Sequence, residues 1–482
     1  MTVAMLDAPP IYSPTWWVHK LATRIRDRRA KIERCDAYYR GDHPLAFASE
    51  KFRTAFGGLF NGFADNWCEL VADAVEERLN VQGFRFGPDR QGDADAALIW
   101  QRNGMDAESQ IGHTEMLVTS EAYALVWGDD DGLAQITVEH PAQTIVAYVA
   151  GSRRKRAAAL KLWTDEYDGS EFATLYLPDG VYKFRSTRRA FPGSIDLGGV
   201  FAEWEPRAVP GEPWPLRNPL GVVPVVPLRN KPRLMADPVS EIERVIPLQD
   251  AINKTVADML VASEFGAFRQ RWATGIEIPL DPQTKQPVEP YKAAVDRVWI
   301  NENPAAKFGE FSETQLGNFV GAIELLVQHV ASQTRTPPHY FALGGQFPSG
   351  ESIKSAETGL VAKVRRKMRH LGESWEEVMR LSFAVEDDPR ATIVDAETIW
   401  ADPESRSEAQ HVDALTKLRA LNVPDEQLWE DAGYSPAQIA RFRDMNDQAV
   451  QRQALGDLGA LSVEPFNPTP VEAPAPDGIT TA

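Results

Sequence analysis

The sequence is short of cysteine and of positive charge. Only two of its 482 residues are cysteines, Cys35 and Cys68. Two thiols without metal-ligand spacing exclude a disulfide framework and favour a reducing compartment. Lys and Arg total 51 against 69 Asp and Glu, so the formal charge is −18. That deficit excludes a protein that wraps DNA by neutralising its phosphates, but it does not exclude a protein past which DNA slides.

Motifs that carry enzyme chemistry are also missing. The sequence contains no phosphate loop ending in Gly-Lys-Ser/Thr, no dinucleotide fingerprint, no His-Glu-x-x-His and no nucleophile elbow. Its eight histidines show no metal spacing. A glycine-containing loop at 344–352 precedes a helix, but Pro348 lacks an N–H and the lysine comes late, at Lys354. We therefore expect a flexible connector there, and no catalytic residue, metal site or cofactor.

Long apolar runs are missing too. No window reaches 18 apolar residues, so no membrane span is expected. Residues 1–9 lack the basic region and apolar run of a signal peptide.

The strongest positive pattern lies at 351–385. Apolar residues recur there every three or four positions, with no proline and few glycines, which predicts one amphipathic helix roughly 50 Å long. The basic run in this helix has two interpretations. It forms either a helix face that is solvated or salt-bridged to another subunit, or a contact with a polyanion. Its members are Lys363, Arg365, Arg366, Lys367 and Arg369.

The remaining periodicity predicts an α+β protein that is mainly helical. Helices are expected at 15–40, 62–79, 93–103 and 107–120, followed from 121 by short β-rich runs separated by turn residues, as in an antiparallel meander. Residues 205–232, dense in proline, are expected to be an extended connector. Asp237 as N-cap and Pro238 at the first helical position predict a helix to about Trp272, which Pro247 kinks or restarts.

A small segment with strand candidates follows at 274–311. A capping box at 312–315 then opens a helix to about Gln333. Beyond 386 we expect helices at 406–421, 425–432 and 436–453. Five prolines and few packing residues predict disorder at 462–482.

Several phrases of the sequence resemble a known family. Residues 45–53, 63–68 and 81–84 are similar to the N-terminal part of tailed-bacteriophage portal proteins, in particular those of actinobacterial siphophages. So are Thr336–Tyr340, Pro348–Ser352 and the helix at 357–383. The resemblance runs in order through residues 30–450.

The resemblance implies the domain organisation of that family. It assigns a wing to 1–237, stem helix 1 to 238–272, a clip to 273–311 and stem helix 2 to 312–334, a tunnel loop and long helix to 335–385, a crown to 386–460, and leaves the tail at 461–482 without a role. The tunnel-loop residues it points to are Phe341, Leu343, Gly344, Gly345, Gln346, Phe347, Pro348, Ser349 and Gly350.

The resemblance also implies function and partners. It implies a ring of normally twelve subunits at one capsid vertex, which packages and ejects double-stranded DNA without sequence specificity and connects head to tail. The implied partners are the terminase large subunit, the major capsid protein, a scaffolding protein and a head–tail adaptor. The implied location is the virion, with assembly in the host cytoplasm and no membrane partner.

Two other classes stay open at this point. One is a minor head structural protein without a channel. The other is a DNA-processing enzyme, which would need a carboxylate cluster for Mg²⁺ and would reveal itself in a metal-dependent cleavage assay.

Overall fold

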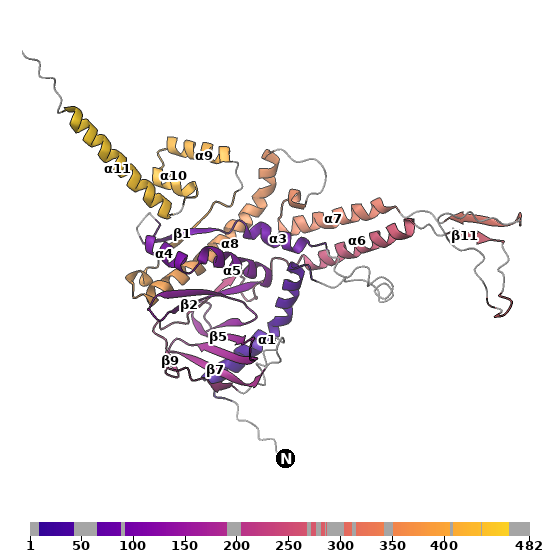
Figure 1. Cartoon of the computed structure of the whole chain (residues 1–482), viewed down its shortest axis with the longest axis horizontal. Coiled ribbons are helices and arrows are strands. Elements are labelled where there is room, and N and C mark those ends of the chain that lie inside the picture. The colour runs from indigo at the N-terminus through magenta and orange to yellow at the C-terminus, as the bar shows by residue number, and fades with distance from the viewer. Residues whose placement is uncertain are drawn as a thin grey trace, which may run out of the picture. The chain divides into compact units, whose positions relative to one another are not determined.

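The computed structural model (Figure 1) divides the chain into two compact units, residues 1–407 and 408–482. It describes residues 9–42, 65–87, 92–189, 204–267, 271–275, 281–284, 286, 303–310, 315–341, 350–404, 408–434 and 436–461. Helices and antiparallel strands together make an α+β fold, as predicted. Among the described residues, none of the helices combines the length and apolar content that crossing a bilayer requires.

The centre of the first unit is the long helix α8. It spans Gly350–Val385, so the predicted single helix is confirmed. One face packs on the three-stranded sheet β10-β2-β3, and its last turns adjoin the strand pair β1–β13. The strand bounds are Val225–Arg229 (β10), Glu121–Gly128 (β2), Ala134–Glu139 (β3), Val81–Phe86 (β1) and Ala396–Trp400 (β13). This contact forms the largest apolar core of the unit.

Three shorter helices complete this core: α3 (Trp67–Glu76), α4 (Ala94–Arg102) and α5 (Met105–Thr119). Each lies inside or beside the range predicted for it, because its apolar stripe is regular. Asp93 caps α4 by accepting hydrogen bonds from Asp95 N and Ala96 N.

A second sheet lies beside helix α1 (Pro14–Tyr39), in the order β4-β5-β6-β7-β8, with β9 also paired to β7. The bounds are Thr144–Tyr148 (β4), Arg156–Thr164 (β5), Ser170–Tyr176 (β6), Gly180–Arg189 (β7), Trp204–Pro206 (β8) and Leu216–Arg217 (β9). Figure 1 shows α1 running along these strands, and Val18, Leu21 and Ile25 of the helix are buried against them. The predicted meander is confirmed for β4 to β7, whereas the strand predicted at 135–138 forms β3 of the other sheet.

An antiparallel helix pair leaves the core. It consists of α6 (Ile246–Ala267) and α7 (Leu316–Thr334), which lie side by side in Figure 1. A two-stranded hairpin, β11 (Arg271–Thr274) and β12 (Lys307–Glu310), lies between them in the chain. The strand predicted at 307–311 is confirmed, while those at 276–278 and 297–300 lie outside the described residues.

The second unit is helical. It contains α9 (Glu408–Ala420), α10 (Asp425–Asp431) and α11 (Pro436–Leu461). Trp429 and Tyr434 pack edge-on against Phe442, with ring centroids 5.7 and 4.9 Å apart. The three predicted helices are confirmed, and the unit begins later than the composition shift at 386 indicated.

Some details of the fold differ from the sequence predictions. Residues 205–232 are more than a connector, because Val225–Arg229 forms β10 and pairs with β2. Pro227 is tolerated since β10 is an edge strand. Strand β13 was not foreseen.

Another difference concerns where the helices begin. Helix α6 begins at Ile246, beside Pro247, so the start at 237 was wrong and the restart at Pro247 is confirmed. Trp272 lies in β11. The N–H of Glu241 donates to Leu117 O at 2.8 Å, which holds this backbone away from a helical path. Helix α7 begins at Leu316, and Gln315 before it makes no side-chain cap; the other residues of the capping box predicted at 312–315 lie outside the described residues.

A fully buried histidine, His113, lies in the core. His113 Nε2 accepts a hydrogen bond from Trp375 Nε1 at 3.0 Å, and its Nδ1 lies 3.2 Å from Leu79 O. Burial lowers the pKa of His113 to about 4. The neutral ring therefore connects α5 to α8 at neutral pH.

We predict a pH-dependent contribution from this ring. The unfolded chain takes up the His113 proton below its ordinary pKa of about 6.5, whereas the folded chain resists until about 4. The contribution of His113 to the free energy of unfolding is therefore fully present at neutral pH and decreases as the pH is lowered. Urea unfolding should show the advantage of the parent over His113→Gln shrinking by about 2 kcal/mol between about pH 7.5 and about pH 5. The exposed His329→Gln is the control, and an unchanged difference would contradict the assignment.

Candidate functional site

A buried carboxylate with three lysines lies where several elements of the first unit meet. The Glu241 side chain is 1% exposed. Its oxygens lie 3.1 Å from Lys363 Nζ, 2.7 Å from Lys367 Nζ and 3.1 Å from Lys231 Nζ. Lys367 also donates to Asn230 Oδ1, and Lys363 donates to the Thr334 carbonyl at 2.6 Å. The cluster thereby joins α8, the end of α7 and the segment after β10.

Local sequence explains this convergence. Lys363 and Lys367 are four residues apart on α8, so both side chains lie on the same face of the helix. Ser240 Oγ accepts from Ile242 N at 3.2 Å and donates to Leu117 O at 3.3 Å, which turns Glu241 inward.

The cluster carries excess positive charge. Burial lowers the pKa of both α8 lysines, that of Lys367 to about 8, although Glu241 opposes the shift. Burial alone would raise the pKa of Glu241, but the three lysines outweigh it and hold that pKa well below its usual range. The Glu241 carboxylate is thus the shared counter-charge of three lysine ammonium groups.

A cavity of about 370 Å³ opens beside the cluster. Eight cationic side chains and one carboxylate, Glu241, line it. The cations are Arg229, Lys231, Arg233, Arg244, Arg335, Lys363, Arg366 and Lys367. This charge balance is opposite in sign to that of the whole chain.

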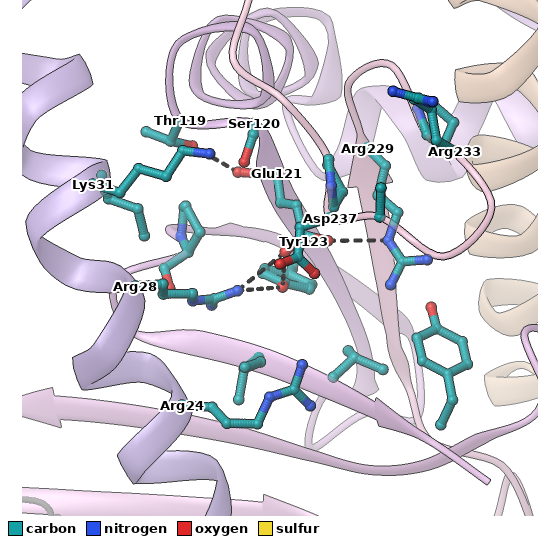
Figure 2. A pocket seen from close by; sticks show the side chains of 18 of the residues that line it. Arg24, Arg28, Lys31, Thr119, Ser120, Glu121, Tyr123, Arg229, Arg233 and Asp237 are labelled. Atoms are coloured by element: carbon teal, nitrogen blue, oxygen red, sulfur yellow. Dashed lines mark hydrogen bonds and ion pairs between the residues drawn. The ribbon is translucent and has the colours of Figure 1, made fainter. Parts of the chain in front are cut away.

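A second cavity, of about 760 Å³, shares Arg229 and Arg233 with the first. Figure 2 shows Glu121 at its centre, with dashed lines to Arg28 and Arg229. Arg28 Nη1 lies 3.1 Å from Glu121 Oε2 and 3.0 Å from the Tyr123 hydroxyl, and Arg229 Nε lies 3.1 Å from Glu121 Oε1. Arg24 and Arg233 lie at opposite sides of the cavity and have no carboxylate partner in the part of the chain that is described. We call the two cavities together the basic groove.

The helix pair α6–α7 presents apolar surface. On α7 the side chains of Leu316, Val320 and Leu325 are 37%, 47% and 55% exposed. Leu260 of α6 is 40% exposed. A helix this apolar, covered along only part of its surface, is typical of a protein–protein contact.

Most of the tunnel-loop residues to which the family resemblance points lie outside the residues that the structure describes. Leu343, Gly344, Gly345, Gln346, Phe347, Pro348 and Ser349 are among the residues that the structure does not describe. Phe341 is 2% exposed and packs on Trp67, with ring centroids 5.3 Å apart. Gly350 is the first residue of α8. Their role in a channel stays a prediction.

The basic run divides into two groups. Lys363 and Lys367 point inward to Glu241 of the same chain. Arg365 Nη2 lies 2.7 Å from Glu404 Oε1 and 3.6 Å from Asp402 Oδ1. Arg366 lines the smaller cavity, and Arg369 is exposed. A channel or inter-subunit role for these residues stays a prediction. Sequence reasoning missed Glu241, because its neighbourhood was taken for a helix start.

We found no group of three or more His, Cys, Asp or Glu side chains placed to hold a metal ion within the described ranges. The excess of cationic side chains makes the basic groove suited to attracting an anionic partner.

We predict that Glu241 stabilises the fold strongly. In Glu241→Gln two buried ammonium groups lose their counter-charge, so we expect a loss of about 3–5 kcal/mol. Thermal unfolding should show a clear drop in Tm, partly recovered by adding Lys367→Met. Glu33→Gln, which breaks an exposed pair with Arg29, is the control and should cost less than about 1 kcal/mol. A Glu241→Gln protein as stable as the parent would disprove the role assigned to the cluster.

Comparison with known proteins gives a consistent family. Residues 18–452 match the family model described as "Phage portal protein, SPP1 Gp6-like". The portal protein of Mycobacterium phage D29 is 31% identical over 415 residues, covering 81% of this chain and 80% of that protein. The portal protein of Mycobacterium phage L5 is 30% identical over 431 residues, covering 84% of each.

Among solved structures, a chain from the neck of an empty GTA particle aligns with a TM-score of 0.42 and 10% identity, over 73% of this chain and 83% of that one. The family match spans most of the sequence and agrees with two relatives of similar length. This chain therefore belongs to the SPP1 Gp6-like family of phage portal proteins.

Proposed function

We propose that this portal protein forms a ring with a central channel at one capsid vertex. Double-stranded DNA enters through the channel during packaging and leaves through it during ejection, and the ring connects the head to the tail. The observation that carries the proposal is the exposed apolar surface of α7, which a neighbouring copy would cover. By its family, the ring contains twelve copies.

In this ring, α6 and α7 form the stem and the segment between them forms the clip. Residues 1–237 supply the wing, 335–350 the tunnel loop ahead of α8, and 386–460 the crown. Its partners are the terminase large subunit, the major capsid protein, a scaffolding protein and a head–tail adaptor. The protein acts in the virion after assembly in the host cytoplasm, and it performs no covalent chemistry itself.

The negative net charge of the chain favours the passage of DNA over tight DNA binding. The chain carries −18, so a ring of copies repels DNA phosphates and resists tight binding. Arg366 and Arg369 have no carboxylate partner within the described residues, while Arg365 already has two. We infer that Arg366 and Arg369 meet a neighbouring subunit, because cations lining the channel would slow the DNA.

Breaking the apolar surface of α7 should break the ring. Val320→Asp places a charge where a neighbour must pack, so we expect folded protein of much lower mass. Light scattering gives the mass, and circular dichroism checks the fold. Leu98→Asp on α4, also an exposed apolar position at 62%, is the matched control and should leave the assembly intact. Rings of normal mass from Val320→Asp would contradict the proposal.

Stiffening the tunnel loop should separate assembly from packaging. Gly344→Pro with Gly345→Pro removes backbone freedom without touching the described core. Rings should form at the parental mass, while genome packaging or retention in infected cells fails. Deleting 462–482 is the control and should preserve the ring. A double variant that packages a full genome at normal yield would exclude this role.

A further inference from the structure

An acidic turn on the second sheet presents a tyrosine to solvent. The turn joins β5 to β6 and contains Asp165, Glu166, Tyr167 and Asp168. The Asp165 carboxylate accepts from Tyr167 N at 2.8 Å, and the Asp168 carboxylate accepts from Ser170 N at 2.7 Å. These bonds shape the turn, and the Tyr167 side chain is left 97% exposed. Tyrosine is enriched among the residues that contribute most to protein–protein interfaces.

The larger cavity of the basic groove offers complementary chemistry. Arg24, Arg153 and Arg233 line it and have no carboxylate partner within the described residues. Six cationic side chains line the cavity against three carboxylates, which are Asp27, Glu121 and Asp237, so its charge stays positive. The Glu121 carboxylate at its centre is already shared by Arg28 and Arg229. At about 760 Å³ the cavity has room for an aromatic side chain with an acidic neighbour.

The turn and the cavity cannot meet within one chain. Arg153 lies in the turn before β5 and Tyr167 in the turn after it, so they are at opposite ends of a nine-residue strand. At about 3.3 Å per residue, roughly 30 Å separates them. Complementary patches on different faces of one subunit produce a head-to-tail contact, which closes into a ring when the rotation permits.

We propose that the larger cavity of the basic groove binds the 165–168 turn of a neighbouring copy of this chain. The Tyr167 ring lies against the guanidinium of Arg24 or Arg233, and Glu166 pairs with the other. The inference rests on the proposed ring and adds a contact between its wings. DNA is the less suitable occupant, because these cations line a recessed cavity while a duplex presents its phosphates on a convex surface.

Photo-crosslinking tests the contact directly. Tyr167 is replaced in the full-length chain by the photoreactive aromatic p-benzoylphenylalanine, and light scattering first records the mass of the assembly. After irradiation, crosslinked peptides are identified by mass spectrometry. We expect crosslinks from the turn to α1 or to residues 229–238 of a neighbouring copy. Rings that crosslink elsewhere would overturn the inference while leaving the ring itself established.

A charge exchange supplies an independent test. Arg24→Glu with Arg233→Glu should raise the concentration at which rings dissociate by about tenfold or more, because it sets like charges against each other. Adding Glu166→Lys should restore part of that loss. Lys20→Glu, one turn from Arg24 and outside the cavity, and Asp130→Lys, in another acidic turn, are the matched controls.

The outcomes are distinguishable. Rescue by Glu166→Lys supports the contact. Rings of unchanged stability that lose DNA would mean that the cavity meets phosphates, which overturns the inference. A parental chain that shows no oligomer by light scattering would overturn both the ring and this contact.

Discussion

The arrangement of the first unit depends on one buried interaction, the Glu241 carboxylate among three lysines. It fixes the segment between β10 and α6 against α8, and the hydrogen bonds of Ser240 and Glu241 to Leu117 add α5. Helix α6 must therefore begin at Ile246, after this anchored stretch. Removing the carboxylate would leave buried cations without a counter-charge, so few other residues are tolerated at position 241.

The same interaction organises the charged surface. Excess positive charge around Glu241 and Glu121 produces a basic groove in a chain of −18. In the proposed ring the acidic remainder faces passing DNA, and the recessed cations hold protein carboxylates. In this proposal the apolar surface of α7 supplies the main driving force for assembly, and charge complementarity adds orientation.

The sequence predicted elements whose signals are local. The 36-residue helix α8 and the meander of the second sheet follow from regular apolar spacing. Contacts between residues distant in sequence could not be predicted from local patterns. Strands β10 and β13, for example, pair with strands about 100 and 300 residues away. Asp237-Pro238 has good start chemistry, but the tertiary bonds of Glu241 overrode it. Two lysines that looked like a surface run are buried, because only the fold brings Glu241 to them. The tunnel loop came from family resemblance alone.

The central claim is that copies of this chain form a ring with a channel. Electron microscopy of the purified full-length protein tests it most directly. The account predicts rings with a central hole, about twelve subunits around it, and two adjacent helices from each copy packed around the channel. Monomers, filaments or closed particles without a hole, seen under conditions where the chain is folded, would contradict it.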